Sequence, residues 1–155
     1  MGQRLNPYTP AAAGALKTLQ DMEAYLAGSG LDHGLMHLLK TRASQINGCA
    51  YCLHMHTADA LKAGETPARL FLLDAWRESS LYTPRERAAL AWTDALTNVS
   101  QTHAPDADYE ALKAEFSEKE MIDLTLLIAA INAWNRISIG FRAQHPHDRP
   151  QAKAA

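Results

Sequence analysis

Two cysteines and one histidine are the side chains in this sequence whose types and spacing best suit covalent chemistry. Cys49, Cys52 and His56 follow Asn47-Gly48, a pair typical of the end of one helix. If the next helix begins near Gly48, the three residues take positions i, i+3 and i+7, within about 60° of one another on one face. Cysteines at this spacing can form a disulfide. His56, four residues after Cys52, can accept its proton or pair with its thiolate.

The reactivity of such a pair depends on how much thiolate it holds near neutrality. An unperturbed cysteine has a pKa near 8.5 and is only about 3% ionised at pH 7. The N-terminus of a helix favours the anion through its unpaired N–H groups and its dipole, which acts mainly on Cys49. His56 acts mainly on Cys52. Which thiol ionises first stays open at this level.

Other interpretations of the same residues are weaker. A lone cysteine is usually a buried small hydrophobe, but two cysteines and a histidine on one face favour chemistry. Structural zinc needs four ligands, and the chain has only two cysteines, so a zinc site is disfavoured. Tyr51 is a candidate proton donor, although packing is the favoured role. His54 points about 140° away from Cys49 and is predicted to lie on the surface.

The elements that must position these residues are all predicted to be helices. Capping and apolar spacing indicate helices that begin at Pro10, Asp32, Cys49, Thr66 and Pro84, with later ones over 108–116 and 121–141. Thr83-Pro84-Arg85-Glu86 and Ser117-Glu118-Lys119-Glu120 have the form of capping boxes. The sequence therefore predicts a single all-α domain over 1–144, with a flexible tail over 145–155.

Two features of these helices bear on the site. His37 lies on the helix before Cys49 and can reach the sulfurs only if the two helices pack as a hairpin. The last helix is the most apolar, yet Asn132, Asn135 and Arg136 interrupt it. Because buried polar groups must be paired, these three are expected to make structural hydrogen bonds. The three tryptophans, Trp76, Trp92 and Trp134, are expected in the core or at an interface.

Composition excludes several classes of function. The chain has 155 residues, 47% hydrophobic and 21% charged, with a formal net charge of −2. This balance gives no electrostatic reason to expect nucleic acid or an anionic membrane as a partner. The start of the chain lacks the apolar stretch of a secretory signal. The longest apolar run, 124–131, is far short of the ~20 residues that cross a bilayer. We therefore expect a cytoplasmic protein whose two thiols serve redox chemistry.

Several segments together resemble the AhpD-like branch of the carboxymuconolactone decarboxylase superfamily. The resemblance covers about residues 15 to 142 and is much more specific than a bare C-x-x-C pattern. Its segments are Lys40 to Cys52, His56-Thr57, Ala63-Gly64-Glu65, Glu86-Arg87 through Trp92-Thr93, and Asn132 to Arg136.

The resemblance implies an all-helical fold, assembly as a homo-oligomer, commonly a trimer or hexamer, and alkylhydroperoxidase activity. Carried over, Cys52 is the peroxidatic cysteine, Cys49 the resolving cysteine and His56 the relay histidine. An external dithiol, such as a protein-bound lipoamide, re-reduces the pair. No metal, flavin or other cofactor is required.

This chain departs from the family pattern at two positions. His37 stands where the family usually has a glutamate that serves as a base in the relay, and Tyr51 stands where the classical peroxidase has a histidine. His37 can accept a proton but brings no fixed negative charge. The departures predict slow activity, activity at higher pH, or another substrate. Two alternatives therefore stay open: a thiol-disulfide oxidoreductase or redox sensor, and a non-catalytic oligomeric binding protein.

Overall fold

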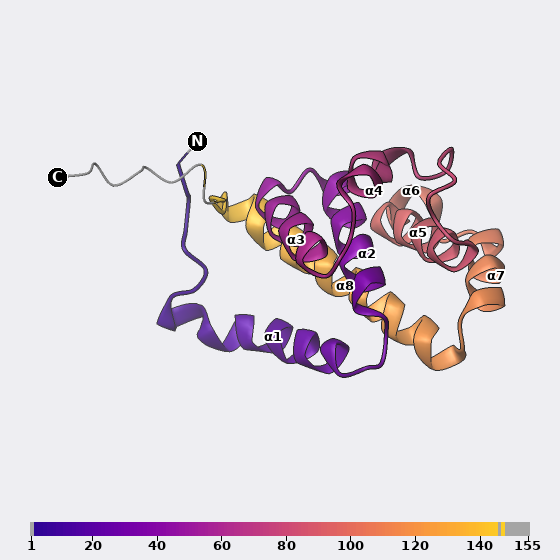
Figure 1. The fold of residues 1–155 in the computed structure, drawn as a ribbon. Coiled ribbons are helices and arrows are strands. Elements are labelled where there is room, and N and C mark those ends of the chain that lie inside the picture. Colours follow the sequence, from indigo (N-terminus) through magenta and orange to yellow (C-terminus); the bar gives the residue numbers. More distant parts are fainter. Residues whose placement is uncertain (1, 146, 148–155) are drawn as a thin grey trace.

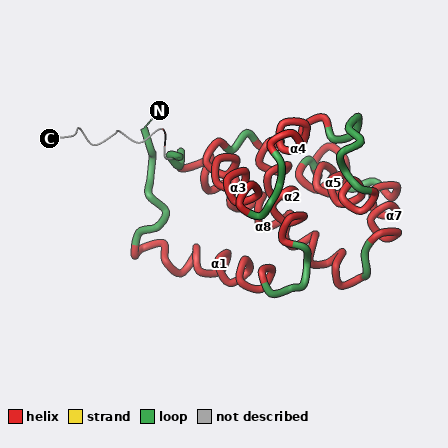
Figure 2. Tube along the Cα trace, in the orientation of Figure 1, coloured by secondary structure: helices red, strands yellow, loops and turns green. Residues whose placement is uncertain are grey.

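The protein folds into an all-helical domain (Figures 1 and 2). The computed structural model describes residues 2–145 and 147, and within them no residue is in a β-strand. The helices follow one another in the order η1 (Pro10–Ala12), α1 (Ala13–Ala27), α2 (His33–Asn47), α3 (Ala50–Lys62), α4 (Pro67–Leu72), η2 (Leu73–Ala75), α5 (Pro84–Thr97), α6 (Val99–Thr102), α7 (Asp106–Glu115) and α8 (Glu118–Phe141). The prediction of an all-α fold is confirmed. All of the expected tail except residues 145 and 147 lies outside the described residues.

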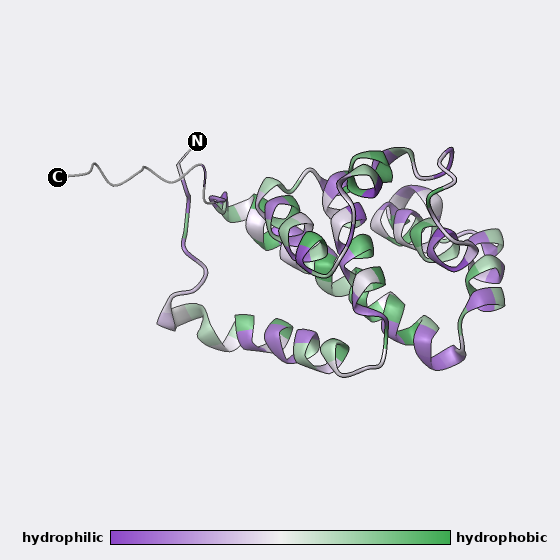
Figure 3. Cartoon of the chain, in the orientation of Figure 1, coloured by the Kyte–Doolittle hydropathy of each residue, from purple (hydrophilic) through white to green (hydrophobic). Residues whose placement is uncertain are grey.

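Helix α8 is the central element of the core. It packs against α1, α2, α3 and α5, and its hydrophobic stretch lies where these helices cross it, while its first turn is hydrophilic (Figure 3). Leu124, Leu127 and Ile131 on this helix are at most 1% exposed. By length and composition alone α8 could span a membrane, since an 18-residue window has a mean hydropathy of 1.3. Its packing on these helices and on α7 is that of a core helix.

The junction between α2 and α3 sets the position of the cysteines. The carboxylate of Asp32 caps the start of α2 by accepting from the N–H of Leu35. Helix α2 ends at Gly48, which adopts the left-handed conformation with φ 68°. This conformation costs a side-chain-bearing residue more than glycine. The chain reverses there within two residues, so α2 and α3 pack against each other as a hairpin. This hairpin is the arrangement that His37 needs in order to approach the site.

The capping boxes are both present. The hydroxyl of Thr83 accepts from the N–H of Glu86 at the start of α5, and that of Ser117 accepts from the N–H of Glu120 at the start of α8. Each glutamate side chain reaches back to the N–H of its cap residue. These reciprocal bonds satisfy donors that a helix start otherwise leaves unpaired.

Three details differ from the sequence-based expectation. The apolar spacing of the fourth helix continues to Trp76 in the sequence, but the helix ends at Leu72 and is followed by the 3₁₀ turn η2. This turn brings Trp76 to Asp94, whose carboxylate accepts from its indole at 3.2 Å. The four-residue helix α6 is too short to show periodicity in the sequence. Helix α7 begins at Asp106, two residues earlier than expected.

Candidate functional site

The two cysteines lie at the start of α3 with their side chains hydrogen-bonded to that helix. Cys49 is the N-cap residue, and its sulfur accepts from the backbone N–H of Cys52 at 3.4 Å. Both residues are only 1% exposed, and both are free thiols. Because a cap residue folds its side chain back over the first turn, this arrangement brings the two sulfurs together.

The environment shifts the pKa values of the two thiols in opposite directions. The pKa of Cys52 is lowered to about 7, first by the hydrogen bond from the thiol of Cys49 and then by donors at Ser138 and Asn135, against the opposing effect of burial. The pKa of Cys49 is raised, because it gives its proton to that hydrogen bond and is itself buried. The two titrations are coupled, so their directions belong to the pair. Cys52 is therefore the thiol that ionises first as the pH rises.

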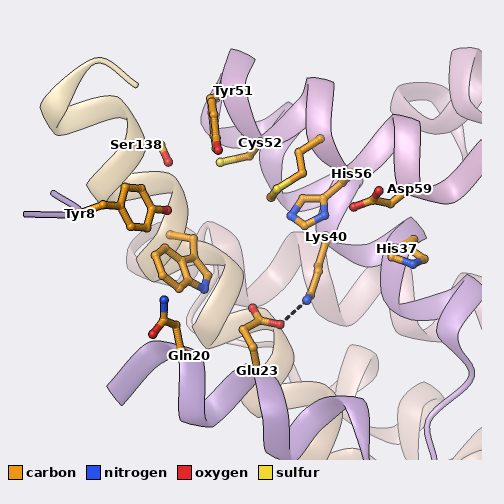
Figure 4. A pocket seen from close by; sticks show the side chains of 12 residues that line it. Tyr8, Gln20, Glu23, His37, Lys40, Tyr51, Cys52, His56, Asp59 and Ser138 are labelled. Atoms are coloured by element: carbon orange, nitrogen blue, oxygen red, sulfur yellow. Dashed lines mark hydrogen bonds and ion pairs between the residues drawn. The ribbon is translucent and has the colours of Figure 1, made fainter. Parts of the chain in front are cut away.

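Cys52 opens onto a cavity of about 330 Å³. Tyr8, Tyr51, Met55 and Trp134 supply apolar surface to its wall. Polar and charged side chains complete the lining: Gln20, Glu23, His37, Lys40, His56, Asp59 and Ser138 (Figure 4). The walls come from the N-terminal segment and from α1, α2, α3 and α8. Residues that are far apart in the sequence, from 8 to 138, therefore line one cavity.

His56 lines this cavity but does not set the charge of the sulfurs. It is 7% exposed, and its pKa is lowered to about 4 by burial and by the nearby Lys40 and His37. In Figure 4 its ring lies near Lys40 and Asp59, while the sulfur of Cys52 points towards Tyr51 and Ser138. The causes that lower the pKa of Cys52 are donors on Cys49 and α8. His56 is therefore a neutral imidazole inside the cavity.

His37 joins the same cavity from α2. Burial lowers its pKa, and the carboxylate of Asp59 opposes that effect. Among the residues that the structure describes, the buried Nδ1 atoms of His37 and His56 have no hydrogen-bond partner. The hairpin of α2 and α3 thus places two neutral imidazoles and one carboxylate on the side of the cavity away from the Cys52 sulfur.

A partly buried ion pair forms another part of the wall, and sequence reasoning missed it. Lys40 on α2 and Glu23 on α1 approach to 2.5 Å (Figure 4). Asp59, three residues after His56 on α3, was also missed. Lys40 stood in the motif that carries the family resemblance, but nothing in the sequence marks Glu23, which reaches the site only because α1 packs alongside. The cavity therefore contains carboxylates although position 37 is a histidine.

The polar residues of α8 make the structural hydrogen bonds that were expected. Asn132 donates to the carbonyl of Ile128 at 2.9 Å, and Arg136 donates to the side-chain oxygen of Asn132 at 3.0 Å. Asn135 is fully buried and bonds to Asn47. Of the three tryptophans, Trp76 and Trp92 are buried, whereas Trp134 is half-buried at the cavity.

The remaining histidine of the motif region lies outside the cavity. His54 is half-buried rather than fully exposed, and its ring stacks on that of His145 with 5.6 Å between centroids. Across residues 2–145 and 147, no group of three or more His, Cys, Asp or Glu side chains is arranged to hold a metal ion.

The fold and this site define an all-helical thiol protein with a Cys-x-x-Cys pair at a helix start beside a cavity. The model of the carboxymuconolactone decarboxylase family matches residues 10–95. The uncharacterised protein YdfG of Bacillus subtilis is 42% identical over 139 residues, which cover 90% of this chain and 94% of YdfG. The chain belongs to the carboxymuconolactone decarboxylase family, in its AhpD-like branch.

Solved structures agree with this assignment. ATU0492 of Agrobacterium tumefaciens, a protein of unknown function provisionally assigned as the antioxidant defence protein AhpD, superposes with a TM-score of 0.90 at 46% identity. The match covers 94% of this chain and 99% of that one. A peroxidase-related protein from Ralstonia eutropha, described as an alkylhydroperoxidase AhpD core, has a TM-score of 0.71 at 21% identity, over 87% and 74% of the two chains. The second likeness concerns the fold alone.

Proposed function

We propose that this protein is a thiol peroxidase that reduces peroxides through a sulfenic acid and a disulfide. The observation that carries the proposal is the asymmetry of the pair. Cys52 faces a cavity with a pKa lowered to about 7, while Cys49 keeps its proton beside it. At pH 7 about half of Cys52 is then thiolate, against about 3% of an ordinary cysteine.

The proposed cycle has three balanced steps. The Cys52 thiolate attacks the terminal oxygen of a hydroperoxide, so that the O–O bond breaks, an alcohol leaves after taking up a proton, and Cys52 becomes a sulfenic acid. The thiol of Cys49 then attacks that sulfur, which forms the disulfide and releases water. An external dithiol finally exchanges with the disulfide and is itself oxidised.

The histidines have a proposed part in proton transfer. His56 and His37 are neutral in the cavity, and a neutral imidazole can donate one proton and accept another. We propose that His56 supplies the hydrogen bond that the departing alkoxide needs, and that His37 connects it to Asp59. The cycle also needs a dithiol partner, for example a lipoyl protein, in a reducing compartment such as the cytoplasm. A homo-oligomer is proposed from the family.

The test is consumption of an organic hydroperoxide with a dithiol reductant, followed for the wild type and for each single cysteine variant. The proposal requires turnover by the wild type and a Cys49–Cys52 disulfide in the peroxide-treated protein. If the pair exchanges with disulfides but never reduces a peroxide, the protein is a disulfide oxidoreductase instead.

A further inference from the structure

Cys52 is held among hydrogen-bond donors that come from α8 rather than from its own histidine. A sulfur that is 1% exposed has lost nearly all its hydration, and a buried anion must be compensated by donors. His56 lies on the Lys40 side of the cavity (Figure 4). We infer that Ser138 and Asn135, one turn apart on α8, are the residues that hold the Cys52 thiolate for its reaction with peroxide.

Ser138 is the first of these donors. Its side chain lines the cavity beside Cys52, and in Figure 4 the hydroxyl lies on the side towards which the Cys52 sulfur points. Hydroxyls inside helices commonly donate to the carbonyl four residues earlier. Thr41, Ser44 and Thr125 all do so here. The hydroxyl of Ser138 instead lies at the cavity beside Cys52, where hydrogen bonding to it helps to lower the pKa of that thiol.

Asn135 is the second donor, and its orientation is fixed by its neighbours. The residue is 0% exposed. Its Oδ1 accepts from Asn47 at 2.8 Å, and its Nδ2 donates to the hydroxyl of Ser44 at 3.0 Å. Because the oxygen is engaged with Asn47, the nitrogen is the end of the amide left to donate, and hydrogen bonding by Asn135 helps to lower the pKa of Cys52. A reversed amide would put an acceptor against the thiolate and destabilise it.

The two residues thus act at the reacting atom from a helix that is far from the cysteines in sequence. Ser138 and Asn135 occupy positions i+3 and i of α8, so they lie on one face of it. That face meets the start of α3, where the N–H of Cys52 is already committed to Cys49. The helix start alone therefore does not supply all the hydrogen bonds that a Cys52 thiolate needs. The side chains of α8 supply further donors to this sulfur.

This inference rests on the proposed function, because it assigns residues to the first step of that cycle. The decisive variant is Ser138→Ala, with Ser100→Ala as a matched control. Ser100 is an exposed serine of α6 outside the cavity. The measurement is the rate of alkylation of Cys52 as a function of pH, followed by mass spectrometry of the peptide, together with the rate of oxidation by peroxide at pH 7.

The expected result is a shift of the alkylation midpoint upwards by about one pH unit in Ser138→Ala, since a hydrogen bond to a charged group is worth about that much. Ser100→Ala should leave it unchanged, and Ser138→Thr, which restores the hydroxyl, should bring it back. Asn135→Asp keeps the shape but places a second acceptor near the sulfur, and it should shift the midpoint in the same direction.

A midpoint in Ser138→Ala equal to that of the wild type overturns the inference, even if the protein is an active peroxidase. A shifted midpoint in a protein that consumes no peroxide overturns the proposed function and leaves the assignment of Ser138 intact. Circular dichroism of each variant checks that the helices are retained. If Asn135→Asp does not fold, the alkylation midpoints of Ser138→Ala and Ser138→Thr alone test the inference.

Discussion

The sulfur of Cys49 accepts a hydrogen bond from the backbone N–H of Cys52 at 3.4 Å, so the first cysteine caps the helix to which the second belongs. This relationship places the sulfur of Cys49 at the first turn of α3, where the pKa of Cys49 is raised and that of Cys52 is lowered. Cys49 offers its proton to Cys52, and Cys52 keeps the negative charge. The predictions below follow from that asymmetry and from the neutral histidines beside it.

Removing each sulfur should have different effects on the cycle. Cys52→Ser should abolish peroxide consumption, because the serine hydroxyl is not ionised near neutrality and cannot replace the thiolate. Cys49→Ser should permit one round of oxidation and then stop at the sulfenic acid of Cys52, which a dimedone adduct would reveal in the intact mass. If both variants consume peroxide at the wild-type rate, the proposed mechanism is wrong.

The thiol of Cys49 should also control the ionisation of its partner. Cys49→Ala removes the first cause of the lowered pKa of Cys52, so the alkylation midpoint of Cys52 should rise by about one unit or more. Since Cys52 is the nucleophile, the rate of oxidation at pH 7 should fall about fivefold or more, in line with the smaller fraction of thiolate. A midpoint that stays near 7 would show that other donors suffice.

The pH profile of the reaction should have one acidic limb. The pKa of Cys52 is lowered to about 7, so the rate should fall as the pH drops through that value. The pKa of His56 is lowered to about 4, so this residue stays neutral above about pH 5 and adds no second limb there. NMR titration of the imidazole should show no protonation between about pH 5 and 8. Protonation near 6.5 would contradict the burial seen here.

The histidine at position 37 can be exchanged for the glutamate that is usual in the family. His37→Glu should raise the pKa of His56, because a nearby negative charge favours the imidazolium, and should increase the rate of peroxide reduction. His37→Gln is the neutral control. Asp59→Asn should act in the opposite direction, since Asp59 raises the pKa of both histidines. If the pKa of His56 is the same in all three variants, then positions 37 and 59 do not influence His56 and have no part in the proton relay.

The turn before the cysteines should be sensitive to its backbone conformation. Gly48 has φ 68°, and an added Cβ would meet no atom within 4 Å, so the cost of Gly48→Ala is a backbone cost. We expect a loss of about 1 kcal/mol in the free energy of unfolding. Gly48→Asn should cost less, because asparagine tolerates this region. Gly14→Ala in α1, where the backbone is helical and the space is also open, should be neutral or stabilising in the same denaturant titration.

The fold followed from local signals in the sequence. Capping at Asp32, Thr83 and Ser117 and the Asn47-Gly48 pair act within a few residues, so they marked most helix starts and the turn before Cys49. Two features of the helices were not marked by such local signals. The four residues of α6 carry no period, and the early end of α4 depends on the contact of Trp76 with Asp94, which comes from a distant helix.

The site was only partly contained in the sequence. The sequence by itself determined that Cys49, Cys52 and His56 share a helix start, because i, i+3 and i+7 spacing is a local property of a helix. Only the tertiary structure decided which groups surround each of them. Packing of α8 against α3 brought Ser138 and Asn135 to the Cys52 sulfur. Packing of α1 brought Glu23 to Lys40, and tertiary packing made His56 a buried, neutral group, because burial and partners depend on chain segments that no local spacing encodes.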